Sequence, residues 1–278
     1  KNKFEEVILP AKNAKEAAVV KGIKIIGCKD LKEVIEYLEG KKEIGPIAEE
    51  NLENFIVENY SVDFSDVKGQ KQAKRALEIS AAGGHNILMI GSPGSGKSML
   101  AKALPSILPK MSLDEALEVT KIHSVCGLTS EDNPLIISRP YRSPHHTASK
   151  VALVGGGSWP KPGEISLAHR GVLFMDEFPE FNRDVLESLR QPLEEGEVTI
   201  SRVQGSLTFP ARFILVAAMN PCPCGYYGDP EKECHCSPGE ILRYQKKVSG
   251  PLLDRIDIQV ELPRVKYDDL KSEEKSES

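Results

Sequence analysis

Long apolar runs are missing from this sequence of 278 residues. The most apolar stretches, such as residues 213–219, are far shorter than the roughly 20 residues that a helix needs to cross a bilayer. The chain begins at Lys1 without a methionine, and it lacks the charged, then apolar, then small-residue order of a secretory signal. We therefore expect a cytoplasmic protein with no membrane span, and we interpret the sequence as part of a longer chain.

The sequence also lacks an excess of positive charge and has few cysteines. Its 36 Lys and Arg against 41 Asp and Glu give a net charge of −5, which excludes a protein that coats nucleic acid over its whole surface. Six cysteines are too few for a disulfide scaffold. Apolar residues make up 40%, so the chain can bury a core, and its length suits about two domains.

The first 58 residues predict a small α/β piece. Apolar runs at residues 7–10 and 23–27 are typical of strands. A capping box that begins at Asn13 predicts a helix through Val20, and Asp30 is expected to cap a second helix over residues 31–38. Two strands and two helices are few for an independent domain, so we expect this piece to complete a domain that begins upstream.

A second domain is expected over residues 62–264, with residues 41–62 as a polar connection and residues 265–278 as a polar tail. Within this domain helical patterns alternate with short apolar runs. That alternation predicts a parallel sheet covered by helices. The expected helices and strands cover residues 71–82, 86–90, 99–104, 172–175 and 213–218.

A phosphate-binding loop follows the expected strand at residues 86–90. The next eight residues, Gly-Ser-Pro-Gly-Ser-Gly-Lys-Ser, fit the pattern G-x-x-x-x-G-K-[ST]. Backbone N–H groups at such a loop converge on phosphates, and the following helix adds its positive N-terminus. Lys97 is expected to reach the terminal phosphates of ATP, and the Ser98 hydroxyl to bind Mg²⁺. The expected nucleotide contacts are Gly91, Ser92, Pro93, Gly94, Ser95, Gly96, Lys97, Ser98 and Met99.

Two further expected strands end in polar residues that suit hydrolysis. The run at residues 172–175 is followed by Asp176, expected to hold Mg²⁺, and Glu177, expected to polarise the attacking water. The run at residues 213–219 ends in Asn220, whose amide is placed to hold that water. The alternatives are solvated acids at a strand end and a turn-forming Asn before proline.

Four cysteines lie close together in one polar segment. Four thiolates within such a short stretch suit a closed tetrahedral zinc site. The four form two pairs, and each pair has one residue between its cysteines, whereas the ligands of structural zinc pairs are usually two to four residues apart. Reduced thiols without a metal therefore remain the alternative. If zinc is bound, His235 could replace one of the cysteines as a ligand. Cys28 and Cys126 are interpreted as packing residues. The candidate zinc ligands are Cys222, Cys224, Cys234 and Cys236.

Residues 133–163 contain no carboxylate but several basic and aromatic side chains. In a chain with net negative charge, this window suits contact with phosphates and stacking on bases, which predicts binding of single-stranded or branched DNA. The alternative is a loop that packs on its own core. Residues 198–209 predict a β-hairpin, with a flap that binds nothing as its alternative. The candidate DNA contacts are Arg139, Arg142, Lys150 and Arg202.

Together these motifs resemble the core of an AAA+ ATPase, and more narrowly the magnesium-chelatase-like branch that contains the ComM/YifB family. The resemblance implies an α/β fold in which helices cover both faces of a parallel sheet. It also implies that residues 1–58 are the end of a Lon-protease-like domain. The similar segments within residues 62–264 are 139–147, 163–170, 190–194, 220–225 and 249–255.

The resemblance also implies individual roles. Lys97 would contact phosphates, Glu177 would be the catalytic base and Asn220 the first sensor. Arg255 would reach into a neighbouring subunit's site, which requires a ring, usually of six subunits. An ion pair within the chain, with Asp254 or Asp257, is the alternative for Arg255. The hairpin would project into the channel of the ring and bring Arg202 to a threaded strand.

Three functions follow from this resemblance. The first is a Mg²⁺-dependent ATPase motor that acts on DNA, as a helicase or in branch migration. The second is the motor subunit of a chelatase, which drives metal insertion through a protein partner. The third is a module that binds nucleotide without turnover, because the helical lid and second sensor arginine implied after Pro263 are not among these residues.

Overall fold

The computed structural model describes residues 4–18, 20–48, 60–129, 135–157, 160–202 and 205–264. The chain forms two compact units. One contains residues 1–58 and 111–138, and the other contains residues 59–110 and 139–278. The segment 111–138, which we had placed within the second domain, thus groups with the N-terminal residues.

The first unit contains a parallel pair of strands, β1 (Glu6–Pro10) and β2 (Lys24–Cys28). Asp30 caps α2 (Leu31–Leu38) as predicted, because its side chain accepts a hydrogen bond from the Glu33 N–H at 2.9 Å. The capping box at Asn13 was wrong. A 3-10 turn, η1 (Ala11–Asn13), gives Asn13 helical torsions, and its side chain makes no capping bond.

The helix after Asn13, α1, covers only Ala14–Ala17 rather than extending to Val20. A longer helix, α5 (Leu113–Val125), also belongs to this unit. It begins with a capping box in which Ser112 and Glu115 bond to each other's backbone N–H groups. Its apolar face buries Ala116 and Val119 in a small cluster.

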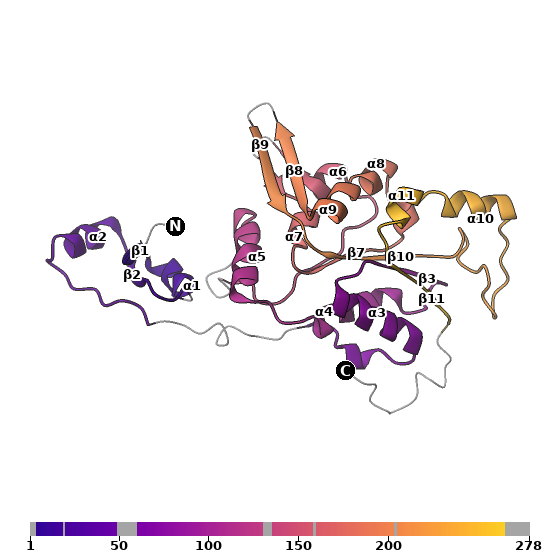
Figure 1. The fold of residues 1–278 in the computed structure, drawn as a ribbon, viewed down its shortest axis with the longest axis horizontal. Helices are drawn as coiled ribbons and strands as arrows, with labels where there is room; N and C mark the ends of the chain where they lie inside the picture. The colour runs from indigo at the N-terminus through magenta and orange to yellow at the C-terminus, as the bar shows by residue number, and fades with distance from the viewer. Residues whose placement is uncertain are drawn as a thin grey trace. The chain divides into compact units, whose positions relative to one another are not determined.

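The second unit is built on a parallel sheet with the strand order β11-β3-β10-β7-β4 (Figure 1). The predicted strands at residues 86–90, 172–175 and 213–218 are thereby confirmed, each within a residue or two. Because neighbouring strands run in the same direction, all their carboxyl ends meet at one edge of the sheet. The strands are β3 (Ile87–Gly91), β4 (Tyr141–Arg142), β7 (Val172–Met175), β10 (Ile214–Met219) and β11 (Ile258–Leu262).

Alternate residues along the three central strands, β3, β7 and β10, enter two different cores, one on each face of the sheet. Leu88 and Leu215 point to one core, whereas Ile87 and Val216 point to the other. Burial on both faces explains why these strands are continuous apolar runs in the sequence. The expected parallel sheet with helices on both faces is confirmed.

One face of the sheet is covered by η3 (Phe64–Asp66), α3 (Lys71–Gly83) and α4 (Lys97–Ile107). Residues from the other short helices pack into the opposite core. These helices are η4 (Phe178–Glu180), α6 (Lys150–Val154), α7 (Glu164–Leu167), α8 (Arg183–Glu187), α9 (Arg190–Glu195), α10 (Pro238–Gln245) and α11 (Gly250–Leu253). Within the described ranges, no helix combines the length and apolarity that a membrane span requires.

The predicted hairpin consists of β8 (Glu197–Arg202) and β9 (Gly205–Pro210), and it extends away from the sheet in Figure 1. Val198 and Ile200 are buried in the core beneath it. A second short antiparallel pair, β5 (Gly155–Gly156) with β6 (Lys161–Pro162), follows α6.

Asn86 joins three strands of the sheet. Its side-chain amide donates to the Arg255 carbonyl at 2.9 Å and accepts from the Leu215 N–H at 2.9 Å. We expect Asn86→Ala to lower the free energy of unfolding by about 1–3 kcal/mol, because a part-buried N–H loses its acceptor. Urea unfolding would measure this loss. Asn182→Ala is the control, since the exposed Asn182 makes no capping bond. Equal stabilities of the two variants would contradict the assignment.

Candidate functional site

The phosphate-binding loop lies between the end of β3 and the start of α4. Gly96 caps α4 in the left-handed region at φ 91°, which admits a side chain only with strain. The buried Lys97 Nζ donates to the carbonyls of Gly91 and Ser92 at 2.5 and 3.0 Å. Burial lowers the pKa of Lys97. The loop therefore closes around the Lys97 amine, the group predicted to contact phosphates.

Residues from two other strands meet this loop. Lys97 Nζ also donates to Asn220 Oδ1 at 3.2 Å, and Asn220 follows β10 directly. The Ser98 hydroxyl donates to Asp176 Oδ2 at 2.9 Å, and Asp176 follows β7. A hydroxyl beside a carboxylate is a donor set that Mg²⁺ accepts, so these two residues fit the predicted magnesium ligands.

Glu177 has a partner that the sequence did not reveal. It adopts the left-handed region at φ 51°, and its N–H donates to Asp176 Oδ1 at 2.9 Å. Its carboxylate oxygen Oε2 lies 2.7 Å from His146 Nδ1. From the sequence, His146 belongs to the carboxylate-free window of residues 133–163, among the side chains expected to contact DNA. No sequence signal joins it to Glu177, because only the fold brings the segment after β4 to the end of β7.

Arg255 forms an ion pair within the chain. Its guanidinium group contacts the carboxylate of Glu194 and donates to the Pro251 carbonyl at 2.5 Å. The alternative that we considered named Asp254 or Asp257 as partner, but Asp257 instead accepts from the backbone N–H of Asn86. The role of Arg255 in a neighbouring site remains a prediction.

Two of the four candidate DNA contacts are engaged within the chain. Arg139 donates to the carbonyls of Pro109 and Arg170 at 2.5 and 2.7 Å. Arg142 makes a bidentate pair with Glu164 at 2.6 and 2.7 Å. These contacts support the alternative that this part of the window packs on its own core.

The other two candidates differ from this pair. Lys150 is exposed at the start of α6. It lines a cleft of about 850 Å³ that also contains Arg183, Lys246 and Lys247. Arg202 ends β8, and its side chain lies outside the described residues. The cleft also reaches His146, the partner of Glu177.

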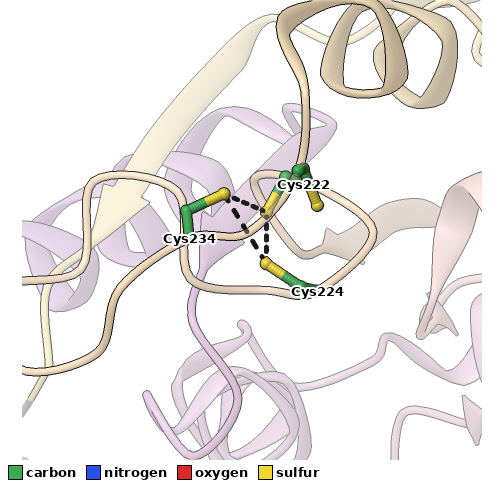
Figure 2. A group of neighbouring side chains, drawn as sticks. Cys222, Cys224 and Cys234 are labelled. Atoms are coloured by element: carbon green, nitrogen blue, oxygen red, sulfur yellow. Dashed lines mark hydrogen bonds between the residues drawn. The ribbon is translucent and has the colours of Figure 1, made fainter.

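The four clustered cysteines converge after β10. The sulfur atoms of Cys222, Cys224 and Cys234 lie 3.4 to 3.7 Å apart and point toward one another (Figure 2). With Cys236, all four sulfurs lie within 4.8 Å of each other. A hydrogen bond from the Tyr226 backbone lowers the pKa of Cys224 to about 6. The thiols are thus gathered as one tetrahedral ion would need them.

The sheet order, the phosphate loop and the polar strand ends define a P-loop nucleotide-binding protein of the AAA+ class. Residues 63–270 match the family model described as magnesium chelatase, subunit ChlI, and the chain belongs to this family. The predicted resemblance is confirmed by relatives in both the ComM/YifB group and the chelatases.

The competence protein ComM of Haemophilus influenzae is 47% identical over 93% of this chain and 50% of its own length. YifB of Escherichia coli is 46% identical over 93% of the chain and 50% of its length. The magnesium-chelatase 38 kDa subunit of Cereibacter sphaeroides is 29% identical over 57% of the chain and 52% of its length. The chain therefore spans about half the length of these relatives.

Among solved structures, a complex of the magnesium chelatase subunits BchI and BchD is similar to the chain, with a TM-score of 0.48 and 24% identity. The similarity covers 73% of this chain and 62% of the other.

Proposed function

We propose that this chain is the ATPase motor of a cytoplasmic ring-forming protein that acts on DNA. The observation that carries the ATPase assignment is the convergence of Lys97, Ser98, Asp176 and Asn220 at one edge of the sheet. Lys97 and Ser98 begin α4 directly after the phosphate-binding loop, whereas Asp176 follows β7 and Asn220 follows β10. Three segments that are distant in the sequence therefore supply the site.

The residues divide the reaction as follows. The Lys97 ammonium exchanges carbonyl partners for phosphate oxygens, and Asn220 stays beside it to hold the attacking water. Ser98 and Asp176 would hold Mg²⁺, which neutralises charge on the phosphates when it is bound. Glu177 accepts the proton of the water, for which its carboxylate must leave His146.

A ring is proposed because the family resemblance assigns Arg255 to the site of a neighbouring subunit. Its contact with Glu194 is partly exposed, so a neighbouring nucleotide can compete for the guanidinium group. Such a contact in trans is heterologous, and a heterologous contact closes into a ring when its rotation allows, as in the hexamers of this superfamily.

Two inactive variants should complement each other. Glu177→Gln removes the base and Arg255→Ala removes the group offered to a neighbour. We expect each variant alone to bind ATP and release almost no phosphate. An equal mixture should recover activity at about a quarter of its sites, where an intact Glu177 meets an intact neighbouring arginine. Phosphate release measures this recovery, and a mixture as inactive as its parts would exclude the role in trans.

DNA is the proposed substrate for three reasons. The cleft that contains Lys150 is lined by four basic side chains and by two carboxylates, Glu180 and Asp184, of which Glu180 pairs with Lys247, so basic groups are in excess. It also reaches His146, the partner of Glu177. The β8–β9 hairpin extends from the core and carries Arg202 near its tip. In addition, a relative that is 47% identical is named as a competence protein. Arg139 and Arg142 would contribute only if they exchanged their present partners.

The test is ATP hydrolysis with and without single-stranded and branched DNA, at low and moderate salt. We expect stimulation that weakens as salt rises, because phosphate contacts release counterions. Lys150→Ala should remove most of the stimulation. Lys161→Ala is the control, since Lys161 is equally exposed in the same carboxylate-free window but does not line the cleft.

A chelatase-type motor that works through a protein partner is the second candidate. It is favoured by the family model and by the similarity to the 38 kDa chelatase subunit. Turnover that is indifferent to DNA would place this candidate first. Nucleotide binding without phosphate release would instead favour the module that lacks turnover.

The convergent thiols are proposed to hold one zinc ion. Elemental analysis should find one zinc per chain, and Cys222→Ser should lose most of it, because a buried ligand of the set is removed. Cys126→Ser is the control, since Cys126 lies outside the cluster and the variant should keep its zinc. Wild-type protein that contains four titratable thiols and no metal would end this proposal.

A further inference from the structure

The segment that carries the cysteines, residues 221–237, is here called the cysteine loop. It begins immediately after Asn220 and lies against the phosphate-binding loop at two points. The first is Gly225, whose backbone faces the ring of Pro93. A Cβ atom added to Gly225 would lie 2.7 Å from Pro93 Cδ, 2.9 Å from Cγ, and 3.7 Å from Asn220 Cγ. The two loops are therefore packed too closely there for any side chain.

The second point is Asp229. Its side chain is only 1% exposed, and a hydrogen bond with the Ser92 side chain lowers its pKa. The same carboxylate accepts from the backbone N–H groups of Glu231 and Lys232 at 2.9 and 3.0 Å. It also lies 3.8 Å from Arg264 Nε. The Glu231 and Lys232 N–H groups hold Asp229 within its own loop, and the contact with Ser92 joins this buried carboxylate to the phosphate loop.

One member of the thiol cluster, Cys222, fixes the turn that makes the first of these contacts. Cys222 is fully buried, and its sulfur accepts a hydrogen bond from the Tyr227 N–H at 3.3 Å. Its carbonyl accepts from the Gly225 N–H at 3.0 Å. The turn that presents Gly225 to Pro93 is thus built directly on one member of the cluster.

We propose that the cysteine loop positions the phosphate-binding loop and Asn220, so that its contacts through Gly225 and Asp229 set the affinity for nucleotide phosphates. The cluster then has a role in the ATPase site itself rather than on a separate surface. This inference rests on the proposed nucleotide binding. It assigns Gly225 and Asp229 as positioning residues, since they act on phosphate through Pro93 and Ser92.

The chain offers a matched pair of glycines for the test. Gly225 and Gly228 lie in the same turn region with φ of 87° and 77°, so alanine meets the same backbone strain at both. Only Gly225 faces Pro93, whereas a Cβ at Gly228 has nothing within 4 Å. We expect Gly225→Ala to weaken binding of a fluorescent ADP analogue by about tenfold relative to Gly228→Ala. Zinc content should be the same in both variants.

A second substitution separates positioning from general damage. Pro93→Ala removes the two ring atoms that the new methyl group would strike. In the double variant Pro93→Ala with Gly225→Ala, the second change should cost far less affinity than it costs alone, about as little as Gly228→Ala costs. General loss of structure at residue 225 would not be rescued in this way.

The outcomes are distinct. Equal affinities of Gly225→Ala and Gly228→Ala, or a double variant that shows no rescue, would overturn the inference. Wild-type protein that binds no ADP analogue would instead overturn the proposed nucleotide site, before any variant is compared. Asp229→Asn gives an independent check, because it keeps the shape of the side chain and removes its charge. It should weaken analogue binding while the protein retains its zinc, and unchanged affinity would count against the second contact.

Discussion

The rest of the site depends on one buried amine. Lys97 lies at the start of α4, and its ammonium group is held by carbonyls of its own loop and by the amide of Asn220. A buried ammonium group is stable only with such partners, because water no longer solvates it. The loop must therefore close around Lys97, and β10 must end beside it. Asn220, directly after β10, meets this constraint from outside the loop.

The parallel sheet meets the constraint by bringing strand ends together. In the order β11-β3-β10-β7-β4, the strand that ends at Gly91 and the strands that Asn220 and Asp176 follow are consecutive neighbours. Each of these three strands is buried on both faces, so the helices on either side hold its register. The residues that follow these strands are consequently fixed to within the reach of a hydrogen bond, although the chain separates them by more than forty residues.

The sequence was sufficient for features with local causes. Continuous apolar runs predicted β3, β7 and β10, because a strand buried on both faces is apolar at every position. The glycine spacing predicted the loop around Lys97. Features produced by tertiary packing could not be predicted: His146 beside Glu177 and Glu194 beside Arg255 join segments whose separation carries no pattern. The error at Asn13 is instructive, because a preceding 3-10 turn overrode a cap that was locally plausible.

The same groups share a further property. Lys97 donates to carbonyls, Ser98 to Asp176 and Arg255 to Glu194, while Glu177 contacts His146. A nucleotide that engages these residues must exchange existing partners, so its binding free energy is a difference between two sets of hydrogen bonds. Charged phosphates are strong acceptors and shift that difference toward binding. Glu177 differs from the other residues because its present partner, His146, also lines the cleft that contains Lys150. A molecule bound in that cleft can therefore influence the contact between His146 and the Glu177 carboxylate.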